Sequence, residues 1–592
     1  MKRYILLFAF ATLSCNLFGS TPAQLNTAFN GTGHLAIPTT SAYAGVDNSD
    51  VTSIAIMPGT GTIVGAGYFT NIPSSNASTA FIQGLNPDGS AAFATNYLYQ
   101  NITNATGLQG STFFGVAIQP GDNKIVAVGY LAFSSITYVI VARFLPTGVL
   151  DTSFNSLANV GIAPQNAGYT GAPGYYALQP IFGVTTSTNA VGRGIVIQPN
   201  GFIVISAENQ VTPIGGFLAR FTPTGVLDTT FDNGGSQQGV TGILQIGGLN
   251  TTIRSAPALQ SDGKIVVAGD NPSTDTLSTV LFVARYTAAG LFDNVGLDPV
   301  SPFGPSGQGY ILPTFPDFQY SSGHQVVIQA NDAIVVVGEV NDTTDNGNAN
   351  YLVARLTENG LGFDTTFNGT GYSINADGQF HVSRYGTVAQ AVAMQPNQQI
   401  VTSGYGYFDS VLNGVILRYN QDGTVDSSFA EQSDQTVANI TFSAALAIAN
   451  NGNVFVGGLY QTPLTSSFID SLYYVSVLGG QTPSTVPATS SIGAYGYNSA
   501  FIGEFLYTDF YATVITNLTV QAAAIADVND IIATYAANYA NQPNFNYISY
   551  LYLINDDLAA AQASLIALYP GSTSQINQFF LYLQERIAIL AA

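Results

Sequence analysis

Short apolar runs separated by polar turns dominate the first 480 residues of the chain. One pattern recurs: an apolar pair, often followed by Gln-Pro, then a polar turn and Ile-Val-x-x-Gly. In one copy the turn at residues 261–264 (Ser-Asp-Gly-Lys) joins Ala258-Leu259 to the β-branched run at residues 265–269. Asp-Gly between two such runs is a strong signal of a β-hairpin. Both strands are almost continuously apolar, which indicates strands covered on both faces.

This hairpin occurs seven times. The seven copies begin at Ala55, Ala117, Val196, Ala258, Val327, Ala393 and Ala447. Most copies are followed by a second pattern, in which an apolar strand ends near an arginine and leads through a glycine turn to Asp-Thr-x-Phe, as in residues 138–154. Each repeat therefore predicts about four strands, and four short strands in about 40 to 50 residues make one blade of a β-propeller.

The two ends of the array complement each other. The seventh repeat has a third strand, residues 472–478, with no Asp-Thr-x-Phe after it. The segment at residues 25–33 (Leu-Asn-Thr-Ala-Phe-Asn-Gly-Thr-Gly) instead matches residues 363–371. The chain thus begins with the strand that its last repeat lacks, and closing a ring removes exposed sheet edges. We expect a mainly β fold, a seven-bladed β-propeller over residues 21–480 closed by the N-terminal strand, with an open stack as the alternative.

The two patterns together carry a family resemblance. Read as one unit, Ala-Ile-Gln-Pro and Ile-Val-x-x-Gly followed by Val-Ala-Arg and Leu-Asp-Thr-x-Phe resembles the delta-60 repeat of bacterial surface and secreted proteins. The resemblance covers residues 25–478 and implies a propeller, without implying an activity or catalytic residues. Repeat 1 departs from the pattern, because Gly84 replaces the arginine and Asp-Thr-x-Phe is missing near Phe93, and so does repeat 7 at Ser476.

The hydrophobic period changes after residue 480. Residues 481–491 (QTPSTVPATSS) are rich in Pro, Ser and Thr and predict a linker. Beyond it apolar residues recur at steps of three and four, as in residues 551–568, and Pro570-Gly571 interrupts the pattern. We expect residues 492–592 to form an α-helical bundle of three to four antiparallel helices, which packs on itself or docks to the propeller or to a partner.

The first twenty residues suggest a location. Lys2 and Arg3 precede an apolar run at residues 4–13, and small or polar residues follow, which is typical of a secretory signal peptide over residues 1–20. Cys15, the only cysteine, lies here. Ordinary cleavage would remove it, whereas lipidation of Cys15 would provide a lipid anchor. We expect an exported protein, secreted or in the cell envelope, with no transmembrane helix, because no later charge-free apolar run reaches about 20 residues.

Composition narrows the function classes. Only 8% of the 592 residues are charged, 46% are hydrophobic, and the formal net charge is -21. A chain this apolar and aromatic is not disordered. Its acidity argues against nucleic acid as a partner, because binding to the phosphate backbone needs clustered Lys and Arg.

The repeats concentrate the basic residues. Five of the ten arginines share one repeat position: Arg143, Arg220, Arg285, Arg355 and Arg418. The acids that follow eight or nine residues later are Asp151, Asp228, Asp293, Asp364 and Asp426. We expect structural pairs, either ion pairs within a blade or aspartates that cap turns. A ring of carboxylates that binds a cation is the functional alternative.

Few residues outside the repeats suggest chemistry. His34, His324 and His381 are isolated, and the chain has no His-Glu-x-x-His, no Gly-x-Ser-x-Gly and no P-loop. Zinc is therefore not expected. An oxygen-rich loop with Asp342 and Asp345 is a candidate calcium site, because calcium prefers oxygen ligands, although polar loops between strands share this composition. Calcium is the one cofactor that the sequence suggests.

These features favour a non-catalytic, exported β-propeller that serves as an interaction or adhesion scaffold of the bacterial cell envelope, with a protein or glycan partner. A glycan-active hydrolase or lyase with a site on one propeller face is one alternative, and a calcium-dependent carbohydrate-binding protein is another. Three or more titratable residues outside the repeat positions, gathered in one funnel, would favour the enzyme.

Overall fold

The computed structural model describes most of the repeat region and part of the C-terminal region. In the repeat region it describes residues 34–36, 46–71, 78–97, 108–133, 136–156, 173–179, 189–232, 238–272, 279–341, 349–374, 384–408, 411–426, 429, 436–437, 440–449, 452–461 and 498–505. In the C-terminal region it describes residues 519–520, 523, 527, 547–573, 576–577 and 580. The expected signal peptide with Cys15 and the expected linker lie outside these residues.

The described strands form six sheets of three or more strands and one two-stranded ribbon. The largest sheet joins both ends of the repeat region: β1 (His34–Ala36), β2 (Val46–Ile56), β3 (Ile63–Asn71), β4 (Ser78–Leu85), β5 (Ala91–Tyr97), β28 (Ile440–Ile448), β29 (Val454–Gln461) and β30 (Asn498–Phe505). Repeat 2 forms β6 (Leu108–Ile118), β7 (Ile125–Phe133), β8 (Ile136–Phe144) and β9 (Tyr175–Leu178). Repeat 3 forms β10 (Ala190–Ile197), β11 (Ile203–Asn209) and β12 (Gly215–Phe221).

The remaining repeats follow the same order. The ribbon consists of β13 (Gln245–Ile246) and β14 (Leu249–Asn250). Repeat 4 forms β15 (Thr252–Ile253), β16 (Ala258–Leu259), β17 (Ile265–Pro272), β18 (Thr279–Tyr286) and β19 (Tyr310–Ile311). Repeat 5 forms β20 (Tyr320–Ile328), β21 (Ile334–Asn341), β22 (Ala349–Leu356) and β23 (Tyr372–Ile374). Repeat 6 forms β24 (Arg384–Met394), β25 (Ile400–Phe408), β26 (Val411–Tyr419) and β27 (Thr436–Val437).

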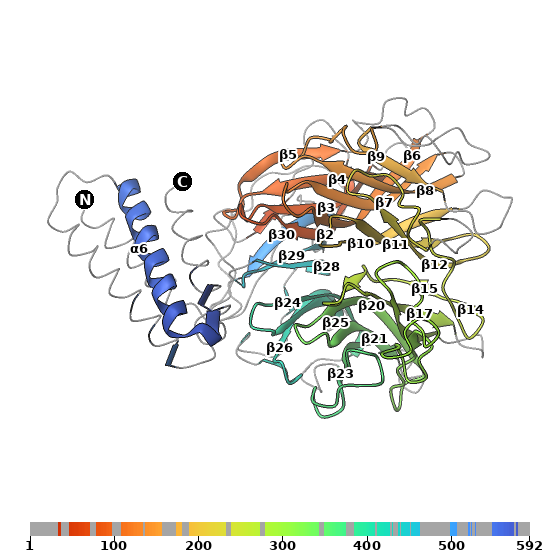
Figure 1. The fold of residues 1–592 in the computed structure, drawn as a ribbon. Coiled ribbons are helices and arrows are strands. Elements are labelled where there is room, and N and C mark those ends of the chain that lie inside the picture. Colours follow the sequence, from red (N-terminus) through yellow and green to blue (C-terminus); the bar gives the residue numbers. More distant parts are fainter. Residues whose placement is uncertain are drawn as a thin grey trace.

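Neighbouring sheets contact one another around a ring. The first strand of repeat 1, β2, contacts β6, and β6 contacts β10. The ring continues from β12 to β15, from β17 to β20, from β20 to β24, from β24 to β28, and from β28 back to β2. Figure 1 shows the sheets arranged as the blades of a propeller. Each sheet is covered on both faces, so the last seven residues of β8 are all buried, as the continuous apolar runs predicted.

The number of blades differs from the prediction of seven. Six sheets are present among the described residues, because the strands of repeats 1 and 7 belong to one eight-stranded sheet. The junction is a parallel pairing of β2 with β30, at Asn48 and Asn498. The first strand of repeat 1 thus lies close enough to the last repeat for hydrogen bonding, which merges two expected blades.

The expected N-terminal strand at residues 25–33 lies outside the described residues, but the strand directly after it joins the last repeat. β1 pairs antiparallel with β30, with His34 opposite Gly503. It follows residues 25–33 directly, just as β23 follows the matching residues 363–371. The third strand of repeat 7 is β30, however, and the expected strand at residues 472–478 lies outside the described residues. β30 therefore places part of the region expected to be helical in the propeller.

A phenylalanine of each outer segment packs against a turn of the next repeat. The partner is a turn glycine with positive φ, and a Cβ at any of these glycines would lie 2.4–2.7 Å from the ring. The pairs are Phe93 with Gly148, Phe154 with Gly225, Phe231 with Gly290, Phe303 with Gly360, and Phe367 with Gly423. Repeat 1 keeps this contact although it lacks Asp-Thr-x-Phe. The phenylalanines and turn glycines of the motif therefore fit one repeat to the next.

The C-terminal region contains a single bounded α-helix among its described residues, α6 (Tyr547–Leu568), followed by a 3₁₀ turn, η3 (Pro570–Ser572). The prediction of a three- to four-helix bundle is therefore wrong for the described residues. The period-based expectation fits α6 itself: Leu558 and Leu565, two turns apart, are both buried, and the helix ends before Pro570. None of the described helical segments is long and apolar enough to cross a membrane.

Candidate functional site

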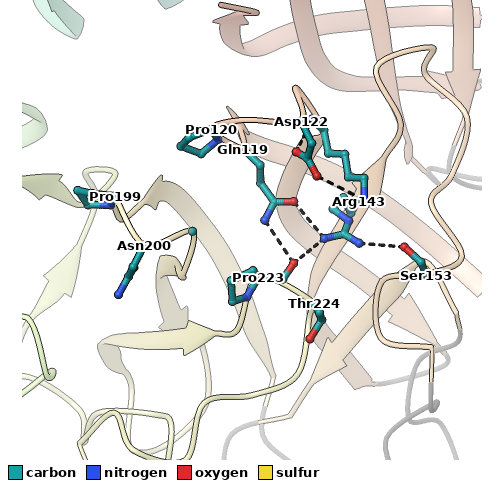
Figure 2. Close-up of a pocket in the computed structure, with 11 residues that line it drawn as sticks. Gln119, Pro120, Asp122, Arg143, Ser153, Pro199, Asn200, Pro223 and Thr224 are labelled. Atoms are coloured by element: carbon teal, nitrogen blue, oxygen red, sulfur yellow. Dashed lines mark hydrogen bonds and ion pairs between the residues drawn. The ribbon is translucent and has the colours of Figure 1, made fainter.

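Arg143 illustrates how the repeated polar residues are used (Figure 2). Its Nε donates to Asp151 Oδ2 at 2.8 Å, and its Nη2 donates to Ser153 Oγ at 3.1 Å. Its Nη1 donates to Gln119 Oε1 at 3.1 Å and to the Pro223 carbonyl of the next repeat at 2.5 Å. Asp151 Oδ1 accepts from the Ser153 backbone N–H at 3.0 Å, which caps the turn. All three guanidinium nitrogens are therefore used within the protein.

The other four arginines of this position are held in the same way. The shortest nitrogen–oxygen distances are 2.6 Å for Arg220–Asp228, 2.6 Å for Arg285–Asp293, 2.8 Å for Arg355–Asp364 and 2.7 Å for Arg418–Asp426. The guanidinium groups lie 4.7–4.9 Å from the ring centroids of Phe154, Phe231, Phe303, Phe367 and Phe429. These contacts make the repeated Arg, Asp, Gln and Phe of repeats 2 to 6 a network that fastens each of these five repeats to itself and, in four of them, to the next repeat.

A cavity of about 530 Å³ lies beside the Arg143 network, between repeats 2 and 3 (Figure 2). Burial opposes ionisation of Asp151, but the hydrogen bonds from Ser153 and the Arg143 charge together lower its pKa. Asp151 is thus a carboxylate already paired with protein donors. The cavity borders a structural network, which leaves the cation-binding alternative without a set of free carboxylates there.

The candidate calcium ligands Asp342 and Asp345 lie outside the described residues, as does His381. In the part of the chain that the structure describes, no three His, Cys, Asp or Glu side chains are grouped to hold a metal ion.

A second set of residues meets at the centre of the ring. The first strand of six repeats carries a β-bulge at the same place, where one residue has no partner on the second strand. In repeat 4 the N–H groups of Arg254 and Ser255 both donate to the Ala268 carbonyl, at 3.1 and 3.2 Å, which makes the same bulge. In order of the repeats, the bulged residues are Thr52, Phe114, Arg193, Arg254, His324, Gln390 and Ala444.

The glycine of Ile-Val-x-x-Gly makes room for this bulge. A Cβ on Gly338 would lie 1.9 Å from the Ser322 carbonyl oxygen, and a Cβ on Gly129 would lie 1.8 Å from that of Thr112. Gly67, Gly269 and Gly404 show the same close approach at 1.8–2.0 Å. Glycine at this position lets the first strand come so near. Repeat 3 forms the same bulge with Ala207 at this position, opposite Gly192 of its first strand. The motif glycine therefore accommodates the bulge in five repeats, and the bulge redirects one side chain in each repeat.

Six of the seven bulged residues line a central channel, a cavity of about 550 Å³. The side chain of the seventh, Ala444, is not described. Asp50 and Tyr68 of repeat 1 also line this channel. The bulged residue changes type from repeat to repeat while the flanking motif stays constant. A nearly symmetric scaffold thus presents an asymmetric set of side chains at its centre.

Repeats 3, 4 and 5 form a charged wall of the channel. Each places an acid of its second strand beside its bulged residue: Arg193 Nη2 with Glu208 Oε2 at 2.6 Å, Arg254 with Asp270, and His324 Nε2 with Glu339 Oε1 at 3.9 Å. Burial, and to a smaller extent the Arg254 charge, lowers the pKa of His324 to about 4, so His324 is neutral near pH 7. Burial also raises the pKa of Glu339.

The two channel arginines use fewer donors than Arg143, Arg220 and Arg285, whose three nitrogens all donate within the protein. Nε and Nη2 of Arg193 both donate to one oxygen of Glu208, and only Nε of Arg254 donates to Asp270. No described protein group accepts from Nη1 of Arg193 or from either Nη of Arg254. Their side chains are 31% and 48% exposed. These nitrogens are therefore available to a ligand in the channel.

Repeat 1 contributes a buried carboxyl group on the other side of the ring. Asp50 is 5% exposed, and its Oδ1 has no hydrogen-bond partner among the described residues. Burial raises the pKa of Asp50 to about 7. Tyr68 lies opposite Asp50 in the β2–β3 register, and burial, followed by the charges of Asp50 and Tyr130, raises the pKa of Tyr68 to about 12. Near pH 7 this wall carries a neutral tyrosine and a partly protonated acid.

Sequence reasoning missed the channel residues. Arg193, Arg254 and His324 are not part of a repeated motif, so neither composition nor motif search singles them out. A signal was present nevertheless. In six repeats the bulged residue stands three positions before the apolar pair, as Thr52 does before Ala55, and in repeat 4 it stands four before. A position that varies inside an otherwise constant repeat marks the channel.

Comparison with known proteins supports a β-propeller repeat family. A family profile described as "Domain of unknown function (DUF5122) beta-propeller" matches residues 121–154, 260–294 and 395–429. Each match runs from the hairpin turn of a repeat to the end of its Asp-containing segment. No curated protein matches the chain.

Several solved structures resemble the fold at low identity. Polysaccharide lyase Uly1 is 10% identical, with 83% of this chain and 98% of that chain covered and a TM-score of 0.38. A protein of unknown function from Dyadobacter fermentans is 10% identical, with 78% and 96% covered and a TM-score of 0.34. A gluconolactonase from Xanthomonas campestris is 9% identical, with 74% and 93% covered and a TM-score of 0.29. Similarities this weak assign no function.

Proposed function

We propose that the protein is an exported β-propeller that binds a small polar ligand, such as the end of a glycan chain, in its central channel. The observation that carries this proposal is the meeting of Asp50, Arg193 and Arg254 in one cavity, while the repeated Arg and Asp are already paired. A scaffold needs no asymmetric set of charged residues at its centre. The order of residues 1–20 supports export, and the motifs support the delta-60 resemblance.

The channel has the size and chemistry of a ligand site. Its volume of about 550 Å³ lies within the range of small-molecule pockets, roughly 300–1,000 Å³. Phe114 offers an aromatic ring, which the Arg193 guanidinium approaches to 5.5 Å from the centroid. Thr52 and Gln390 add a hydroxyl and an amide to the lining. Such a mixture of aromatic and hydrogen-bonding groups suits a sugar.

Catalysis on that ligand is the second candidate. A buried carboxyl group with a pKa near 7 can take up or release a proton at neutral pH, which favours the hydrolase or lyase alternative at Asp50. The calcium-dependent alternative rests on Asp342 and Asp345 in the sequence, and equal melting temperatures with calcium and with a chelator would argue against it.

Arg254→Ala tests the ligand site. We expect the variant to lose at least about tenfold in affinity for any sugar that stabilises the wild type, because it removes two unused donors. Its own melting temperature should change little, since the Arg254–Asp270 pair is half exposed. Thermal shift and calorimetry with a panel of neutral and acidic mono- and oligosaccharides measure both quantities, with Gln245→Ala, an exposed substitution outside the channel lining, as control. A wild-type protein that binds no sugar in the panel would contradict the proposal.

A further inference from the structure

We propose that the channel ligand carries a carboxylate, as an acidic sugar does, that the terminal nitrogens of Arg193 and Arg254 bind this carboxylate, and that Asp50 binds the ligand in its protonated form. This inference rests on the proposed function of the channel. It adds the class of ligand and the reason why binding should depend on pH.

The two arginines lie on adjoining first strands. A Cβ on Gly194 would lie 2.2 Å from Ala256 Cα, so the strands of repeats 3 and 4 touch directly after Arg193 and Arg254. Glu208 holds the Arg193 guanidinium through Nε and Nη2, and Asp270 holds the Arg254 guanidinium through Nε. Arg254 therefore presents both terminal nitrogens as a planar fork, which matches a carboxylate with two parallel hydrogen bonds, and Arg193 adds its Nη1.

The scaffold arginines serve as an internal comparison. Arg285, for example, donates from Nε, Nη1 and Nη2 to Asp293, Gln260 and the Ser301 carbonyl. The channel arginines instead leave three terminal nitrogens without an acceptor among the described residues. Because Arg143, Arg220 and Arg285 use all three of their nitrogens within the protein, the unused donors of Arg193 and Arg254 indicate an acceptor that comes from outside the chain.

Asp50 supplies the second half of the site. It lies on β2, and by the order of the sheets repeat 1 stands across the ring from repeats 4 and 5. Tyr68 on β3 faces it in register, and Tyr130 on β7 lies close enough to interact with Tyr68. Across the channel the charged groups are the ion pairs Arg193–Glu208 and Arg254–Asp270. The remaining titratable groups there are the neutral His324 and Glu339 beside it.

Burial is the cause of the raised pKa of Asp50, and no neighbouring cation among the described residues lowers it again. An ionised Asp50 would repel an anionic ligand across a poorly screened cavity, whereas the protonated acid can donate a hydrogen bond to a hydroxyl or carboxylate oxygen. The bound anion in turn favours the protonated acid. Binding above pH 7 is therefore coupled to the uptake of one proton, and affinity falls as pH rises through the pKa of Asp50.

Calorimetry on the full-length protein tests the inference with a matched pair of probes, methyl glucuronoside and methyl glucoside. We expect the wild type to bind the glucuronoside at least about tenfold more tightly than the glucoside at pH 6, and to lose about tenfold in affinity per pH unit above pH 7. Asp50→Asn, which mimics the protonated acid, should bind with the affinity of the wild type at acid pH and show no such slope. Asp122→Asn, at an exposed acid outside the channel, should keep the wild-type slope.

Arg254→Gln should remove the preference for the glucuronoside, because it takes away the charge and the fork but keeps one donor group. Equal binding of both probes in a channel-dependent manner would overturn the acidic-ligand inference and leave the proposed function intact. The same pH slope in wild type and Asp50→Asn would overturn the role of Asp50. Binding of neither probe, in a protein that also binds no other sugar of the panel, would overturn both.

Discussion

Arg285→Ala is expected to destabilise the propeller by about 3–5 kcal/mol, because it leaves a buried carboxylate without its partner. Arg285 is 3% exposed and Asp293 is fully buried. The substitution also removes the hydrogen bonds to Gln260 Oε1 at 3.0 Å and to the Glu358 carbonyl of the next repeat at 3.1 Å. Lys264 Nζ lies 3.5 Å from Asp293 Oδ2 but donates to Asp298 at 2.9 Å, so it replaces only part of the guanidinium contact. Chemical denaturation measures the loss.

Two further variants separate the charge from the geometry. Arg285→Lys keeps the charge but cannot reach Asp293, Gln260 and Glu358 together, so it should recover only part of the loss. Arg193→Ala, at a partly exposed pair, should cost less than about 1 kcal/mol. If Arg285→Ala were as mild as Arg193→Ala, the repeated Arg–Asp pairs would not be what fastens the blades.

Gly338→Ala is the second substitution with a large expected effect, a loss of about 3 kcal/mol. The new Cβ would meet the Ser322 carbonyl oxygen at 1.9 Å, and both atoms belong to backbone that cannot move without breaking the β20–β21 pairing. The bulge at His324 should be lost with it. Denaturation measures the stability, and ligand binding reports on the channel.

Gly362→Ala is the matched control. A Cβ there meets nothing within 4 Å, and the φ of Gly362 lies outside the left-handed region. Its stability should stay within about 0.5 kcal/mol of the wild type. Similar losses in the two variants would mean that the close approach at Gly338 does not hold the first strand in place.

Much of the fold could be predicted from the sequence because its determinants are local and repeated. The hairpin turns, the double cover of the strands and the partnership of β1 with the last repeat all follow from short patterns that recur. The eight-residue spacing of Arg143 and Asp151 likewise predicts their ion pair, because one turn separates the two segments. The merged sheet of repeats 1 and 7 depends on how the ring closes, which no local pattern encodes.

The candidate site could not be predicted in the same way. Asp50, Arg193 and Arg254 are about 60 to 200 residues apart along the chain, and only the arrangement of their strands around the ring brings them to one cavity. The third strand of repeat 7, expected at residues 472–478, is another example, because β30 pairs with β29 in the structure and residues 472–478 lie outside the described part of the chain. The strand that pairs there, β30, follows an insertion whose length the repeat does not specify. The spacing of apolar residues at steps of three and four predicts helix α6, because that signal is local. A bundle depends on contacts between separate helices, which this spacing does not specify.

The pairing of β1 with β30 has a consequence for how the chain folds. His34 and Gly503 are neighbours in the sheet although about 470 residues separate them, which makes this one of the longest loops that the fold has to close. Contacts of such high sequence separation form slowly, so the earlier blades can assemble from local hairpins while the ring is still open. Until β30 has been synthesised and pairs with β1, both strands present unpaired edges. Completion of the ring is therefore the step at which the chain stops being prone to pair with other molecules through open strand edges.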